Sequence, residues 1–342
     1  MAVMRDATPF EKSLDCFFDR HQNIKNQTSY AVAVSGGPDS MACAHALYMW
    51  CRAHKKHLHV ITVDHGLRAE AEREAQQVAD WVTAQKDENF IHQILHWEGD
   101  KPDTRVMEQA RTARYNLMAE YCRDRDIHTL FVAHHQDDQA ETFLIRLAKG
   151  SGLDGLTGMS ELRNHDDRLT LARPFLSCPK QVLVDYCTRH DVCFVQDPSN
   201  ENTHYLRPRL RQSVEVLKEE GLTPERLSSL TRRLNRARQA LEEISAKVYK
   251  DVLMQESKND LMLNFETLKQ HPEEIAFRIV KKAIEKVQDH NGYGVRMEKL
   301  ENLFEEMWYN TDNFKPRTLG GLMFAMKDKN KILYMTKEVG SL

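Results

Sequence analysis

The sequence predicts an α/β protein with an open parallel sheet and helices on both faces, followed by a smaller, mainly helical domain that ends in a short hairpin. Three observations predict it. From residue 30 to about 135, apolar strand-like runs alternate with amphipathic segments of helical length. A glycine-rich turn separates the first such run from the first such helix. From about Val214 onward, long charged helical segments replace the alternation.

Each element of the alternating region is predicted from its own pattern. In a sequence, buried parallel strands are short, nearly continuous apolar runs. Amphipathic helices have apolar residues that recur with a period of about 3.6 residues. The expected strands are Tyr30–Val34, Leu58–Val63, Phe90–His96 and Leu130–Ala133. The expected helices are Met41–Ala53, Glu70–Lys86 and Arg105–Arg123, with a further helix near Lys180–His190. Ligands of such sheets bind beyond the carboxyl ends of the strands, so the loops there should line one crevice.

The length of 342 residues favours two domains. We expect an N-terminal helical extension at residues 1–29, a catalytic domain at residues 30–213, and a mainly α-helical domain at residues 214–342. Near the end, Thr318–Met326 and Lys331–Met335 flank a polar turn and predict the hairpin.

Composition excludes several classes of protein. A net charge of −3 means that any nucleic-acid partner must be held by a local basic patch. We see no apolar run long enough for a membrane span and no signal-peptide core, so we expect a cytoplasmic protein without membrane contact. The seven cysteines are scattered and form no Cys-x-x-Cys, which argues against a disulfide framework, a zinc knuckle or an iron–sulfur cluster.

The segment Ser35-Gly36-Gly37-Pro38-Asp39-Ser40 is the most informative in the chain. It follows the first strand and opens a helix, and its two glycines let backbone N–H groups approach an anion closely. The positive end of the following helix points to the same place. The segment therefore predicts a phosphate-binding loop, although it fits neither the Walker pattern nor Gly-x-Gly-x-x-Gly.

Two further motifs lie where other strands end. Asp64-His65-Gly66-Leu67-Arg68 offers Asp64 to a ribose or base, and His65 and Arg68 to phosphate. His134-His135-Gln136-Asp137-Asp138-Gln139-Ala140-Glu141-Thr142 opens a helix on which Asp138, Glu141 and Thr142 can share a face. Carboxylates beside a nucleotide are typical ligands of Mg²⁺. Helix capping also accounts for acidic residues at this point, but it requires neither paired histidines nor paired aspartates.

These motifs, in this order, resemble the ATP pyrophosphatase (PP-loop) superfamily, whose sheet is Rossmann-like, and within it the bacterial tRNA(Ile)-lysidine synthetases. The resemblance covers residues 30 to about 211 closely and the rest more loosely. Its other elements are Arg111-x-x-Arg114-Tyr115, Gly150-Ser-Gly, Arg173-Pro174 and Asp197–Asn200.

The resemblance implies a two-step reaction that uses ATP and Mg²⁺. The O2 oxygen of the wobble cytidine, in a tRNA(Ile) with a CAU anticodon, attacks the α-phosphate and releases pyrophosphate. The amine of free L-lysine then displaces AMP and gives lysidine. Asp39 and Asp138 are the expected catalytic and magnesium-binding residues. The expected ATP-binding residues are Ser35, Gly36, Gly37, Pro38, Asp39, Ser40, Asp64, His65 and His134.

Arginines predict where the tRNA binds. Arg207, Arg209 and Arg211 alternate, which places them on one side of an extended segment. The expected substrate-binding and tRNA-binding residues are Arg68, Arg111, Arg114, Glu141, Arg207, Arg209 and Arg211, and a basic helix face adds Arg226, Arg232, Arg233, Arg236 and Arg238. The chain departs from the family at Pro208, where an asparagine is usual, and we expect the third domain of longer members to be reduced or missing.

Other functions compete with this one. A tRNA 2-thiocytidine synthetase uses a similar loop, but its sulfur chemistry usually requires a Cys-x-x-Cys that this chain lacks. Amide-forming synthetases of nucleotides have no use for an arginine-rich connector. A catalytically dead tRNA-binding module would not need Asp39, Ser40 and Asp138. Release of pyrophosphate distinguishes an enzyme from such a module. The oligomeric state stays open, with a homodimer as one option.

Overall fold

The computed structural model describes residues 8–64, 66, 70–97, 106–195, 214–288 and 295–338. The chain divides into two compact units, residues 1–234 and 235–342. The boundary that we expected near residue 213 falls where the structure describes no residues, so it stays a prediction.

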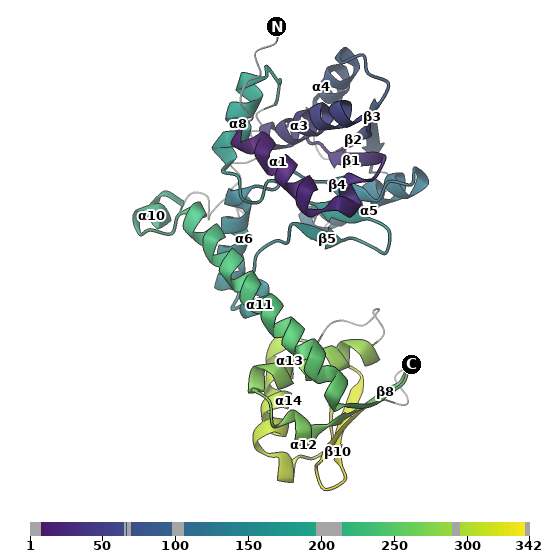
Figure 1. Ribbon diagram of the computed structural model, residues 1–342, viewed down its shortest axis with the longest axis vertical. Coiled ribbons are helices and arrows are strands. Elements are labelled where there is room, and N and C mark those ends of the chain that lie inside the picture. Colours follow the sequence, from purple (N-terminus) through teal and green to yellow (C-terminus); the bar gives the residue numbers. More distant parts are fainter. Residues whose placement is uncertain are drawn as a thin grey trace. The chain divides into compact units, whose positions relative to one another are not determined.

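The first unit contains a six-stranded sheet in the order β3-β2-β1-β4-β6-β5 (Figure 1). All neighbouring strands are parallel except β5, which pairs antiparallel with β6. The predicted open parallel sheet is therefore confirmed, with one antiparallel edge strand. The strands are β1 (Ser29–Ala33), β2 (His57–Asp64), β3 (Phe90–His96), β4 (Thr129–Phe131), β5 (Leu162–Asn164) and β6 (Thr170–Ala172).

Helices cover both faces of this sheet because the strands are apolar on both sides. Tyr30 and Val32 of β1 pack in a core with one set of helices, whereas Ala31 belongs to a second core on the other face. The first set is α1 (Pro9–Arg20), α3 (Pro38–His54), α4 (Glu70–Ala84) and α8 (Lys180–Arg189). Helix α5 (Val106–Asp124) covers the opposite face.

The N-terminal segment belongs to the core of the first unit. Helix α1 is followed by the short α2 (Gln22–Lys25). Phe10 and Phe18 of α1 have no exposed surface. Phe10 stacks on Phe175 with ring centroids 4.0 Å apart, and Phe18 stacks on Trp50 at 3.7 Å. These rings join α1 to α3 and to the segment that follows β6.

A smaller group of helices completes the first unit. It consists of α6 (Gln136–Ala148), α7 (Leu153–Leu156), α10 (Val214–Glu219) and the start of α11 (Pro224–Val252). Ala140 and Phe143 of α6 pack against Leu227 of α11 in a small apolar cluster. Helix α11 begins at Pro224 and continues past residue 234 into the second unit.

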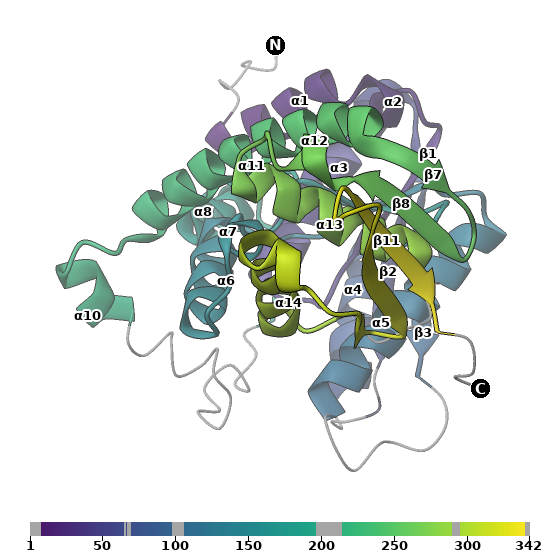
Figure 2. The ribbon, with the colours of Figure 1, turned by 90° about the horizontal axis from the view of Figure 1, so that it is seen from below.

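The second unit is built on an antiparallel sheet in the order β7-β8-β11-β10-β9 (Figure 2). The predicted hairpin is present as β10 and β11, and its turn holds Asp328, Lys329 and Asn330 at positive φ. Strands β7 and β8, which we did not expect, extend the sheet. The strands are β7 (Leu253–Glu256), β8 (Asp260–Asn264), β9 (Arg317–Leu319), β10 (Leu322–Lys327) and β11 (Ile332–Lys337). The helices are α12 (Phe265–Leu268), α13 (Glu273–Val287), α14 (Met297–Tyr309) and the 3₁₀ turn Thr311–Asn313.

None of the helices in the described part of the chain is long and apolar enough to cross a membrane.

We expect Phe10→Ala to lower the free energy of unfolding of the first unit by about 3–5 kcal/mol, because it removes a fully buried ring and leaves a cavity. Met49→Ala on α3 is the matched control. Met49 is 47 % exposed, and its truncation should change stability by no more than about 0.5 kcal/mol. Urea unfolding followed by tryptophan fluorescence measures the free energy of unfolding of both variants. Equal effects would show that α1 is not part of the core.

Candidate active site

The glycine-rich loop lies between β1 and α3 at the carboxyl end of the sheet. Gly36 has φ +84°, a conformation that side chains rarely adopt, and Gly37 is the residue before the first turn of α3. The hydroxyl of Ser40 donates to the Gly37 carbonyl at 3.0 Å and accepts from the Ser35 N–H at 3.2 Å. The loop is thus closed on itself by Ser40, and the amino end of α3 opens beside it.

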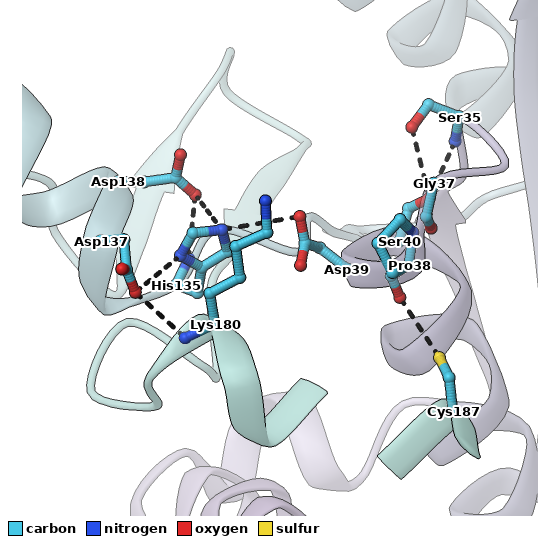
Figure 3. A network of polar contacts seen from close by, with 10 residues as sticks. All are labelled: Ser35, Gly37, Pro38, Asp39, Ser40, His135, Asp137, Asp138, Lys180 and Cys187. Carbon is cyan, nitrogen blue, oxygen red and sulfur yellow. Dashed lines mark hydrogen bonds and ion pairs between the residues drawn. The ribbon is translucent and has the colours of Figure 1, made fainter. Parts of the chain in front are cut away.

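Residues far away in the sequence hold this loop in place. The N–H of Val195 donates to the Gly36 carbonyl at 2.9 Å. A side chain at position 36 would lie 3.8 Å from Val78 of α4 and from Val195. The thiol of Cys187 contacts the Pro38 carbonyl at 3.4 Å (Figure 3). Both α4 and the end of the α8 segment therefore support the turn.

A second motif meets the loop at the amino end of α6. His135 precedes α6 and is 4 % exposed. Its Nε2 lies 3.5 Å from Oδ2 of Asp39 and 3.4 Å from Oδ2 of Asp138. Its Nδ1 lies 3.6 Å from Oδ2 of Asp137. Figure 3 shows the imidazole between Asp39 on one side and the two α6 aspartates on the other.

The carboxylates determine the charge of this histidine. Burial alone would lower the pKa of His135, but Asp137, Asp39 and Asp138 outweigh burial and raise the pKa to about 10. The ring is therefore an imidazolium at neutral pH. It offsets part of the repulsion between carboxylates that come from two different helices.

The two α6 aspartates also have structural contacts. Oδ2 of Asp138 accepts the N–H of His135 at 3.1 Å, which caps the start of α6. Oδ2 of Asp137 accepts the N–H of Lys180 at 3.0 Å and joins α6 to the start of α8. Burial raises the pKa of Asp137, but His135 and the Lys180 N–H outweigh it, so the pKa is lowered overall.

The chemistry of the site fits Mg²⁺. Within the described residues, no group of three or more His, Cys, Asp or Glu side chains forms a metal site by itself. Nucleotide-bound Mg²⁺ does not need one, since one or two carboxylates, phosphate oxygens and water complete its shell. Asp39 and Asp138 provide two carboxylates, and Oδ1 of Asp39 is buried without a hydrogen-bond partner in the part of the chain that is described. A cation would satisfy that oxygen.

His134 and Glu141 lie beside this centre. Nδ1 of His134 accepts from Nε of Arg173 at 3.3 Å, and Arg173 is 3 % exposed. Arg173 also donates to the Ser160 carbonyl at 2.8 Å. Glu141 is buried on α6, on the same helix as Asp138.

The structure describes three of the remaining expected site residues, Asp64, Arg111 and Arg114. Asp64 ends β2, accepts the N–H of Gly66 at 2.8 Å and lies 3.6 Å from Nδ1 of His96. Arg111 and Arg114 of α5 place their guanidinium carbons 5.2 and 5.4 Å from the centre of the Tyr115 ring. Burial lowers the pKa of Arg114, so it is not a freely solvated helix residue. His65, Arg68, Arg207, Arg209 and Arg211 lie outside the described residues.

The sequence pattern alone indicated no role for two residues of the motif itself. One is His135, whose imidazole lies among the carboxylates of Asp39, Asp137 and Asp138. The other is Gln139, whose side-chain amide donates to the Met159 carbonyl at 2.7 Å and whose carbonyl accepts the Met159 N–H at 2.6 Å. The feature of the sequence that could have pointed to both residues is their position at the start of a helix whose first residues are almost all polar.

Comparison with known proteins identifies the family of the domain that contains this site. The family described as PP-loop domain matches residues 7–218. Among solved structures, a U34-tRNA thiolase from Methanococcus maripaludis covers 66 % of the chain and 78 % of its own length with a TM-score of 0.55, at 16 % identity. That similarity shows the fold alone.

Several similar curated proteins carry the name tRNA(Ile)-lysidine synthase. That of Methylobacterium nodulans is 41 % identical over 80 % of this chain and 79 % of its own length. The relative from Wolbachia pipientis is 30 % identical over 92 % of this chain and 75 % of its own length. The relative from Bradyrhizobium diazoefficiens is 42 % identical over 65 % of this chain, and the match spans only 61 % of that relative. The chain belongs to the tRNA(Ile)-lysidine synthase family of PP-loop enzymes.

Proposed function

We propose that the chain is an ATP-dependent ligase that joins lysine to carbon 2 of the wobble cytidine in tRNA(Ile) with a CAU anticodon. One observation carries the proposal. Asp39, from the PP loop, and Asp138, from α6, both lie within 3.5 Å of the same buried nitrogen of His135. Two helix starts and two carboxylates are thereby directed at one point, which suits a triphosphate and its cation.

In the first step, the cytidine O2 forms a bond to the α-phosphorus and the bond to the leaving pyrophosphate breaks. Negative charge then grows on the equatorial phosphate oxygens and on the leaving group. The N–H groups at the start of α3 and around Gly36 stabilise that charge. When bound, Mg²⁺ supplies further positive charge at the phosphate oxygens. Asp39 and Asp138 would hold it.

In the second step, a neutral amine of lysine forms a bond to carbon 2, and the bond to the AMP oxygen breaks. The amine must lose a proton, and a carboxylate at its side can accept it. Asp138 and Asp39 are the candidates, since both are partly exposed, at 18 % and 28 %. Glu141, on the same helix as Asp138, and Arg114 of α5 are the charged residues we propose for the substrate. Asp64 and His134 would contact the nucleotide.

The direct test is incorporation of radiolabelled lysine into a tRNA(Ile) transcript with a CAU anticodon, in the presence of ATP and Mg²⁺. We expect label with lysine and that tRNA. We expect none with arginine or with a methionine tRNA of the same anticodon. ATP cleaved to AMP without lysine transfer would contradict the assigned nucleophile, and absence of both would contradict the proposed reaction.

A matched pair of glycine variants tests the loop. Gly36 has φ +84°, so Gly36→Ala introduces backbone strain of about 1–2 kcal/mol, whereas Gly37 has φ −72°, which alanine adopts freely. Without nucleotide, Gly36→Ala should lower the thermal midpoint by about 2–4 °C per kcal/mol of strain, and Gly37→Ala should barely change it. Gly36→Ala should also weaken ATP binding in calorimetry. If the two variants had equal midpoints, the left-handed turn would not be a constraint on the loop.

A further inference from the structure

The first half of α11 is basic, and among the described residues only the last of its arginines, Arg238, has a carboxylate partner. Residues 226–241 contain five arginines and no aspartate or glutamate, in a chain whose net charge is −3. Farther along the same helix the pattern changes. Arg238 lies 3.5 Å from Glu242, and Lys247 lies 2.9 Å from Glu243. Such pairs, four residues apart, are typical of a helix surface that only meets water. The first turns of α11 lack this arrangement.

The arginines lie on the part of the helix that the first unit does not cover. Leu227, Ser228 and Thr231 are buried, with exposed fractions of 4 %, 3 % and 2 %. Arg226, Arg232 and Arg233 are exposed. Arg226 donates to the Gly221 carbonyl, and Arg232 contacts the Ser228 hydroxyl at 3.5 Å. Arg233 has no carboxylate partner within the described ranges. We name Arg226, Arg232 and Arg233 the arginine face.

The covered side of α11 is anchored to the helix that carries Asp138. Leu227 packs against Ala140 and Phe143 of α6. The methyl group of Thr231 approaches Gly158 so closely that a Cβ there would lie 3.3 Å from it. The neighbouring Met159 is bonded through its backbone to the side chain of Gln139, next to Asp138. A ligand held on the exposed side is therefore held in a fixed relation to α6.

We propose that the arginine face binds the phosphate backbone of the tRNA substrate. The inference rests on the proposed function, which supplies a polyanionic substrate. Guanidinium groups match phosphate oxygens in charge and in their forked geometry. Unpaired arginines on a rigid helix can make such contacts without first breaking an ion pair. The contacts position the RNA and carry no sequence information, so selection of the tRNA must come from elsewhere.

The test is the salt dependence of tRNA binding by the full-length Arg232→Gln/Arg233→Gln variant. Gln keeps most of the side-chain length and removes the charge. We expect the dissociation constant for the tRNA(Ile) transcript to rise on the order of tenfold, and the slope of log K against log salt to flatten by roughly 1.5, since two phosphate contacts are lost. An unchanged thermal midpoint verifies that the variant is folded.

Arg52→Gln/Lys55→Gln is the matched control. It makes the same change in net charge on exposed residues at the carboxyl end of α3. A helix of 17 residues is about 25 Å long, so these residues lie far from the loop at its amino end. This variant should keep the wild-type salt slope.

Equal slopes for the two variants, or a wild-type slope in Arg232→Gln/Arg233→Gln, would overturn the assignment of the arginine face. Failure of the proposed function gives a different result. In that case the wild-type protein incorporates no lysine, whatever the binding of the variants shows.

Discussion

The structure depends on one buried electrostatic contact, in which the imidazolium of His135 lies among the carboxylates of Asp39, Asp137 and Asp138. Without a cation between them, the starts of α3 and α6 would bring like charges together in a partly buried place. With it, the start of α3 and the start of α6, which lie far apart in the sequence, meet at one point. The phosphate loop and the acidic helix then act as a single centre rather than as two motifs.

The parallel sheet and the two principal motifs could be predicted because their signals are local. An apolar run followed by Ser35–Ser40 specifies a strand, a turn and a helix start by its own composition. The role of His135 could not be predicted, since His134 and His135 are neighbours and only the backbone at the start of α6 decides which ring is buried. Val195 and Cys187 support the loop through contacts between distant segments, for which no local pattern exists.

In the second unit, two strands could not be predicted from the sequence for a different reason. Strands β7 and β8 were missed because β7 follows α11 without a break and its residues Met254, Gln255 and Glu256 are exposed. β8 is a strand because it pairs with β11, and β7 because it pairs with β8, so tertiary contact outweighs local propensity there. Likewise, sequence alone could indicate that α11 is basic, but not which side of it α6 covers. The buried Leu227 and Thr231 decide that.

The central claim is that Asp39 and Asp138 serve one cation–phosphate centre, and calorimetric titration of ATP with and without Mg²⁺ tests it most directly. Asp39→Asn and Asp138→Asn keep the side-chain shape, and asparagine at 138 can still accept the His135 N–H. In the wild-type protein, Mg²⁺ should tighten ATP binding by roughly tenfold or more, and each variant alone should lose that gain while tRNA affinity stays nearly unchanged. Full retention of the Mg²⁺ effect by either variant would contradict the account.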